Sequence, residues 1–193
     1  TLTLTHSHGA TFSSAVTTGT SVVLSNTTGT ITFADNLSTP VLTTTANGYN
    51  VALLGTTTHV TDANTATSFL NTGNLVLGNG VGDSLTFAGG LTATAPAAIQ
   101  AAGTIATTNT AMSLGDSDTA LTLTGHLTLN TSGGDLTLGG SVNGTTSNTE
   151  SLTLNAGSTG AVSVTGAMGQ TTALKTLTLT HSHGATFSSA VTT

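Results

Sequence analysis

The stretch SLTLNAGSTGAVSVTGAMGQTTALKTLTLT, residues 151–180, carries the pattern that decides the fold. Apolar and polar residues alternate in SLTL at 151–154, in AVSV at 161–164 and in TLTLT at 176–180. A period of two places alternate side chains on opposite faces of a β-strand. We therefore expect leucine, valine, isoleucine and phenylalanine to face inward, and threonine and serine to face outward.

The same alternation recurs along the chain. Leu127, Leu152 and Leu177 each begin an L-T-L triplet, and successive triplets are 25 residues apart. Further alternating segments lie at 2–5, 30–33, 84–87, 120–124, 126–129 and 135–138. The N-terminal half keeps the spacing loosely, and around residues 27 and 102 it is off by several residues. Short strands and glycine turns that repeat every 20–50 residues are typical of a solenoid.

We predict an all-β fold, a right-handed parallel β-helix (β-solenoid) with about 25 residues per coil. One such coil cannot bury its leucines alone, whereas stacked coils pair their strands at about 4.8 Å and bury leucine against leucine. The best helix candidate is APAAIQAAG at 95–103. It is short and carries Pro96, so we interpret it as a turn or at most one helical turn.

The first and last eighteen residues of the sequence are identical: TLTLTHSHGATFSSAVTT stands at 1–18 and again at 176–193. The offset between the two copies corresponds to about seven coils of the predicted length. We therefore expect residues 1–175 to be one complete solenoid repeat, and residues 176–193 to be the start of the next tandem repeat. Three pairs of inward residues are then expected to share environments seven coils apart: Leu2 with Leu177, Leu4 with Leu179, and Phe12 with Phe187.

Composition excludes several classes of function. Of the 193 residues 49 are threonine and 24 are glycine, while only 4% are charged, against about 25% in ordinary domains. The net charge is −6, and Lys175 is the only Lys or Arg, so no basic surface for nucleic acid can form. No apolar run approaches the roughly 20 residues of a membrane span. An enzyme of the carbohydrate-active β-helix kind would need clustered charged groups, so we expect no enzyme activity and no cofactor.

The stretch AVSVTGAMGQTTALKTLTLTHSHGATFSSAV, residues 161–191, resembles the β-strand repeats of giant bacterial surface proteins of the filamentous-haemagglutinin adhesin type. Their cassettes read approximately V-G-G-T-T-A-L followed by L-T-L-T. The matching residues are Gly166, Gly169, Thr171, Thr172, Ala173, Leu174, Leu177 and Leu179. The chain departs from the pattern at Ala167, Met168 and Gln170. The resemblance implies a right-handed parallel β-helix outside a bacterial cell, and it brings no catalytic residues.

We expect no metal site, and two small groups of residues are the candidates weighed against that expectation. His6 and His8, with their copies His181 and His183, are two residues apart, so within a strand both imidazoles of a pair would point the same way. Two ligands fall short of the three or four that zinc requires, and the alternative is a solvated pair beside a turn. The carboxylates of Asp116 and Asp118 offer oxygen ligands to Ca²⁺, and the alternative is ordinary aspartate in a glycine turn.

Two further motifs have weaker chemistry. GNGVGDSL at 78–85 resembles a calcium-binding glycine-rich nonapeptide but lacks its spacing and occurs once. Lys175 follows Glu150 at the distance of one predicted coil, so the two could form a cross-link or an ion pair between neighbouring coils. We expect the ion pair, worth less than about 1 kcal/mol if exposed.

We expect a structural function: a segment of a long repetitive fibre that is extracellular or at the cell surface, such as a filament, sheath, matrix or adhesin stalk. Its partners would be further copies of the same repeat, with lateral association into fibres or sheets. The alternative is an ice-binding solenoid that presents ladders of Thr-x-Thr. Such pairs occur at 1–5, 30–32, 56–58, 92–94, 122–124 and 176–180.

Overall fold

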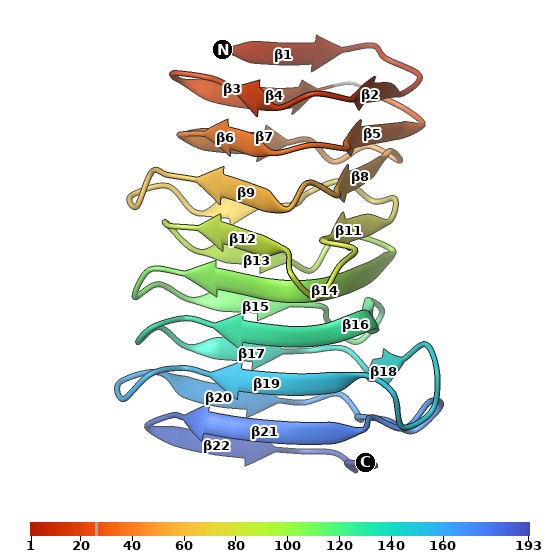
Figure 1. Ribbon diagram of the computed structural model, residues 1–193, viewed down its shortest axis with the longest axis vertical. Coiled ribbons are helices and arrows are strands. Elements are labelled where there is room, and N and C mark those ends of the chain that lie inside the picture. Colours follow the sequence, from red (N-terminus) through yellow and green to blue (C-terminus); the bar gives the residue numbers. More distant parts are fainter. Residues whose placement is uncertain (26) are drawn as a thin grey trace.

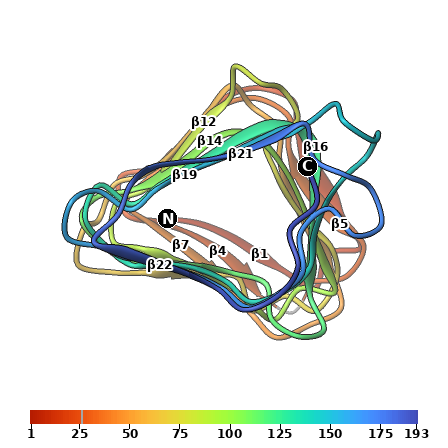
Figure 2. The ribbon, with the colours of Figure 1, turned by 90° about the horizontal axis from the view of Figure 1, so that it is seen from below.

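Twenty-two β-strands wind into a coil of triangular cross-section in the computed structural model, which describes residues 1–25 and 27–193 (Figures 1 and 2). The described residues contain no helix, and every strand pair is parallel. Seen from the C-terminal end in Figure 2, the chain runs counterclockwise as it advances toward the viewer. The fold is therefore a right-handed parallel β-solenoid, as predicted.

Each turn of the coil has three sides, which we call faces A, B and C in chain order (Figure 2). Face A holds β1 (Leu2–Thr5), β4 (Ser21–Ser25), β7 (Val41–Thr44), β10 (Thr67–Ser68), β13 (Leu91–Ala93), β15 (Met112–Leu114), β17 (Leu136–Leu138), β20 (Ala161–Val164) and β22 (Gly184–Phe187). Between β7 and β10 the Thr44 hydroxyl bridges the two strands, donating to the Ser68 carbonyl and accepting from the Leu70 N–H.

Faces B and C share two long strands, β14 (Ala98–Thr107) and β16 (Ala120–Asn130), which each turn the corner between them. Face B also holds β2 (Ala10–Phe12), β5 (Thr30–Phe33), β8 (Asn50–Leu53), β11 (Leu75–Leu77) and β18 (Val142–Gly144), and single bridges continue it through Met168 to Val191. Face C also holds β3 (Val16–Thr17), β6 (Leu37–Thr39), β9 (Thr57–Val60), β12 (Ser84–Phe87), β19 (Ser151–Asn155) and β21 (Thr176–His181).

The coils vary in length more than the sequence indicated. The stack contains about eight turns spaced about 23 residues apart, so the average coil is shorter than the predicted 25 residues. The coil between Leu2 and its partner Val22 is several residues shorter than the coil between Thr58 and its partner Leu85. The difference has a simple cause: hydrogen bonding fixes the register of adjacent strands, while the corner loops between strands are free to differ in length.

The inward side chains form one continuous aliphatic core along the axis. Leu127, Leu152 and Leu177 stack as predicted, and the first two are fully buried. Aromatic side chains fill the N-terminal half, where the rings of Phe12 and Phe33 stack at 4.9 Å. Because parallel strands stack residue upon residue, each coil buries its neighbours and is buried by them.

Two expectations about local structure are wrong. Residues 98–103 lie in β14, not in a helical turn, because Ile99 and Ala101 stack between the coils before and after them. Threonine also does not always face outward. Thr39, Thr44, Thr58, Thr67, Thr107, Thr119 and Thr131 are buried. Thr119, for instance, donates its hydroxyl to the Pro96 carbonyl at 2.6 Å, which satisfies a polar group inside the coil.

The corner that carries the V-G-G-T-T-A-L-like segment depends on glycine. A Cβ atom on Gly166 would collide with the carbonyl oxygen of Gly140 in the coil before it. A Cβ atom on Gly140 would collide with the Thr119 carbonyl oxygen in the same way. Successive coils therefore approach at this corner through backbone alone.

Candidate functional site

His6 and His8 of the first copy lie beyond the end of β1, so no strand geometry aligns their two imidazoles. β1 ends at Thr5, and His6 takes a left-handed backbone conformation with φ of 55°. Nδ1 of His8 lies 3.1 Å from the hydroxyl of Thr28 in the next coil. Both imidazoles are exposed at a corner, where they line no common pocket: the hollow beside His6 is formed with Thr27, Thr28, Asn47 and Gly48.

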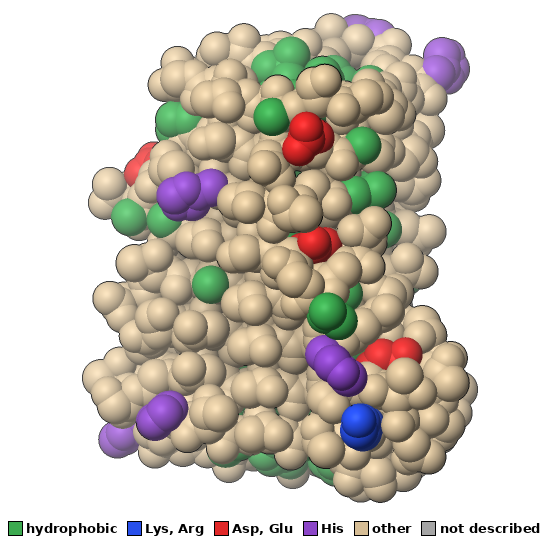
Figure 3. Space-filling view, viewed as in Figure 1, with side chains coloured by type: hydrophobic (Ala, Val, Ile, Leu, Met, Phe, Trp, Pro, Cys, Tyr) green, Lys and Arg blue, Asp and Glu red, His purple; other side chains and the backbone are tan. Residues whose placement is uncertain are grey.

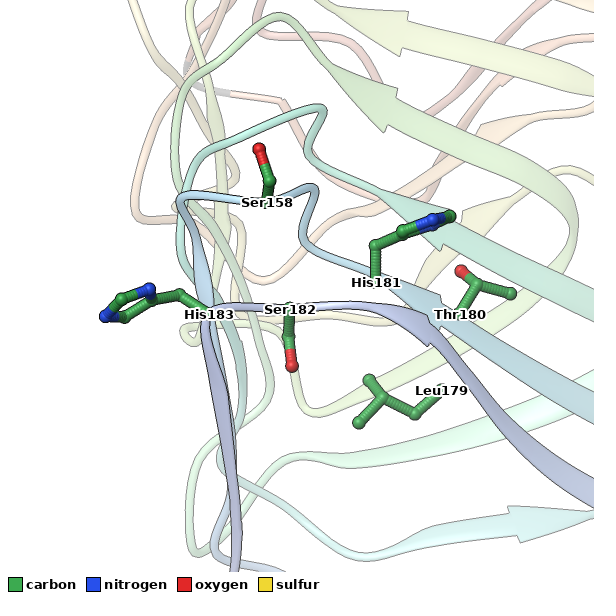
Figure 4. A pocket seen from close by; sticks show the side chains of 6 residues that line it. All are labelled: Ser158, Leu179, Thr180, His181, Ser182 and His183. Carbon is green, nitrogen blue, oxygen red and sulfur yellow. The ribbon is translucent and has the colours of Figure 1, made fainter.

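The second histidine pair is arranged differently. His181 is the last residue of β21, and His183 lies beyond the strand. Figure 4 shows the two imidazoles projecting in different directions on either side of Ser182, around a shallow hollow that Ser158 and Leu179 also line. The described residues contain no group of three or more His, Cys, Asp or Glu side chains placed to hold a metal ion.

Asp116 and Asp118 lie in an exposed turn, and the Asp116 carboxylate hydrogen-bonds the backbone of that turn. One carboxylate oxygen of Asp116 accepts hydrogen bonds from the N–H groups of Asp118 and Thr119, both at 3.0 Å. Asp83, in the glycine-rich segment 78–85, likewise accepts from the N–H groups of Asn79 and Gly80 at 2.8 Å. The Asp116 contact is an ordinary Asx turn, whereas Asp83 accepts from N–H groups that precede it in its loop.

Glu150 and Lys175 are neighbours in adjacent coils, but they meet through the backbone. The Lys175 N–H donates to the Glu150 carbonyl at 2.7 Å. The Glu150 side chain is buried and turns the other way, accepting from the Thr145 hydroxyl at 2.6 Å and the Thr146 N–H at 3.3 Å. Burial acts to raise the pKa of Glu150, but these hydrogen bonds outweigh it and hold the pKa below its ordinary value. The predicted ion pair is thus replaced by a capped loop.

The Thr-x-Thr pairs are spread over the whole surface. Pairs 1–5 and 92–94 lie on face A, 30–32 and 122–124 on face B, and 56–58 and 176–180 on face C. Face A instead carries a single file of hydroxyls through six consecutive coils, formed by Ser68, Thr92, Ser113, Thr137, Ser163 and Thr186. On the side of the molecule shown in Figure 3, where face C is in front, few charged side chains are seen.

The two coils at the ends of the stack are built like interior coils but are covered on one side only. In β19, Leu154 is fully buried, while Leu179, stacked on it in β21, is 40% exposed. Phe187 and Val191 in the last coil are 37% and 42% exposed. Apolar side chains are also visible at both ends of the molecule in Figure 3.

The two copies of the eighteen-residue segment occupy different faces, so the prediction of equivalent positions is wrong. The first copy runs through faces A, B and C as β1, β2 and β3. The second copy begins on face C as β21, continues on face A as β22 and reaches face B at Val191. From β1 to β20, seven turns pass on face A, and β21 follows two faces later. The sequence repeat therefore spans seven and two-thirds turns.

Comparison with known protein families, with curated proteins and with solved structures found no match. No helix in the described part of the chain has the length and hydropathy that a membrane crossing requires. The structure is a regular scaffold, and the histidines and aspartates considered as candidate site residues are scattered over its corners and turns. The sequence had already indicated that residues 176–193 continue into another repeat, because the two identical apolar segments contain nothing that resembles a cap.

Proposed function

We propose that this chain is a structural segment of a long repetitive fibre, extracellular or at the surface of a bacterial cell. The observation that carries the proposal is the double use of one sequence. At 1–18 the segment supports the following coil, with Leu4 under Leu24; at 176–193 it lies on the preceding coil, with Leu179 on Leu154. Only a stack that continues in both directions buries both of its sides.

The surface chemistry supports the same proposal. A fibre exposed outside a cell must stay hydrated and resist proteolysis. Rows of hydroxyls such as the one on face A bind water without charge. Lys175 is the only residue after which trypsin can cleave. An edge that ends a solenoid normally carries a cap of different sequence, because an open edge templates association. The repeated segment has no charge, proline or helix to serve as one.

The length of tandem chains tests the proposal. Chains of one, two and four copies of residues 1–175 would be compared by small-angle X-ray scattering and electron microscopy. A continuous stack adds about 37 Å per repeat, from seven and two-thirds turns at about 4.8 Å each. Separate units joined by flexible junctions would instead give beads of constant size, and that result would exclude the fibre.

A further inference from the structure

The eighteen-residue segment pairs with the following coil in its first copy and with the preceding coil in its second copy. Together the two copies show both sides of a junction between repeats. The first copy shows what lies after the segment: Leu2 pairs with Val22, Phe12 with Phe33 and Val16 with Leu37. The second copy shows what lies before it: β21 pairs with β19, β22 with β20, and Val191 with Met168. Because the two sequences are identical, the contacts on both edges of the segment at a junction can be taken from pairs that the structure already shows.

We propose that residues 176–193 are the docking surface for residues 19–25 and 27–39 of a second copy of this repeat, and that the second copy is rotated by one face, about a third of a turn, relative to the first. This inference rests on the proposed fibre function and adds its geometry. The registers observed at the first copy assign the contacts. Leu177 receives Val22 of the second copy, Leu179 receives Leu24, and Phe187 receives Phe33.

The exposed apolar side chains match this occupant. Phe187 is 37% exposed in the last coil, whereas Phe12, its equivalent in the first copy, has the ring of Phe33 stacked on it at 4.9 Å and 15°. Val191 is 42% exposed, and its equivalent Val16 pairs with Leu37. In the last coil this sequence exposes its apolar edge, and in the first coil the same edge is covered by the coil that follows it.

The rotation follows from the number of faces between the copies. Seven and two-thirds turns separate β1 from β21, so a repeat that continues in the same way starts one face behind its predecessor. The inner surface tolerates this because all three faces are lined by aliphatic side chains. Leu2 packs with Val22 on face A, and its copy Leu177 packs with Leu152 on face C.

The corner at His-Ser-His shows how the backbone adapts to a different face. In the first copy His6 adopts a φ of 55°, which turns the chain from face A to face B. In the second copy the strand continues through His181, and a register shift follows Leu154, so that Asn155 pairs with His181. One sequence thus forms two different corners without losing its inward leucines.

A rotating repeat has a functional consequence. Any side chain of the repeat, for example the hydroxyl file on face A, reappears on a different face in each successive copy and returns after three copies. No side of the fibre then carries one uninterrupted binding surface. Lateral contacts would be distributed around the axis, so the fibre is expected to associate in bundles rather than in single-layered sheets.

Disulfide trapping tests the docking surface. In a chain of two repeats, Thr178→Cys would be combined with Val23→Cys of the second copy, because the equivalent pair, Thr3 and Val23, lies in register on adjacent strands. We expect nearly complete cross-linking under mild oxidation. The matched control combines Thr178→Cys with Thr32→Cys of the second copy, which lies on another face and should not react. Equal reaction of both pairs, or of neither, would overturn the docking register.

Cryo-electron microscopy of a chain of six or more repeats tests the rotation. We expect a continuous rod with a rise of about 37 Å per repeat and a rotation of about a third of a turn. A continuous rod with almost no rotation, whose repeats each contain a whole number of turns, would refute the rotation but leave the fibre standing. Its rise would be about 34 Å for seven turns or about 38 Å for eight. A chain that breaks into separate units at each junction would refute the fibre itself.

Discussion

Leu179→Ala distinguishes an interior coil from a terminal one. In the 193-residue chain Leu179 is 40% exposed and has no coil beyond it, so its truncation leaves no closed cavity. We expect a loss of about 1 kcal/mol, in line with partial burial of a leucine side chain. Leu154→Ala, one coil earlier in the same column, removes a side chain with no exposed surface and should cost about 3 kcal/mol.

The same change should become more costly when the stack is extended. In a chain of two repeats, Leu24 of the second copy would cover Leu179, and Leu179→Ala should then cost about 3 kcal/mol, as at Leu154. A solenoid opens coil by coil, so a global unfolding midpoint would blur the effect. Hydrogen–deuterium exchange of the peptide that contains β21 reports local opening directly.

The expected readout is a change in protection of β21. In the single chain Leu179→Ala should speed exchange about fivefold, and in the two-repeat chain about a hundredfold, if the change is expressed as local opening. Thr178→Ala, on the outward side of the same strand, is the matched control and should change exchange little in either chain. An equally small effect of Leu179→Ala in both chains would mean that the segment never becomes interior, and the stacking account would be wrong.

Further predictions concern the fold itself. Gly166→Ala should lower stability by about 3 kcal/mol, because its Cβ would collide with the Gly140 carbonyl; a variant with unchanged urea midpoint would contradict the close approach. Leu152→Asp should destabilise by several kcal/mol through a buried unpaired carboxylate, whereas Thr153→Asp should cost little; equal costs would reverse the assignment of inside and outside. The carboxylate of Glu150 has a pKa below its ordinary value of 4.5, so it stabilises the fold above that pH and loses this contribution as the pH falls through the folded-state pKa. Glu150→Gln should therefore cost about 1 kcal/mol at pH 7 and flatten the acid limb of the stability curve; an unchanged limb would contradict the assignment. Far-ultraviolet circular dichroism should show strand and almost no helix, and a helical content above about one fifth would exclude the solenoid.

The sequence predicted the local pattern of the fold but not its winding. The column Leu127, Leu152 and Leu177 was visible because the two coils between these residues have the same length and carry leucine at the same position. The first coils, such as the one between Leu2 and Val22, are shorter, and their columns mix leucine, valine and threonine. Extrapolating the regular coils therefore led to seven turns per repeat instead of seven and two-thirds and concealed the change of face.

The candidate sites were harder to predict, because corners decide them. Spacing alone placed both histidines of each pair on one side of a strand, but a strand that ends at Thr5 cannot orient His6 and His8 together. The same holds for Glu150, whose partners are set by the loop containing Thr145 rather than by its distance from Lys175. The conformation of a corner depends on how closely neighbouring coils approach there. A single sequence indicates a close approach only where a glycine is required.

Fibre diffraction tests the central claim most directly. If tandem repeats form one continuous stack, the strands lie across the fibre axis and an aligned sample gives a strong reflection at about 4.8 Å on the meridian. The same reflection would be absent from the meridian, or spread evenly in a ring, if the repeats folded as separate units without a common axis. A meridional reflection at about 4.8 Å from chains of four or more repeats is the result that the account predicts, and a powder ring from well-aligned fibres would contradict it.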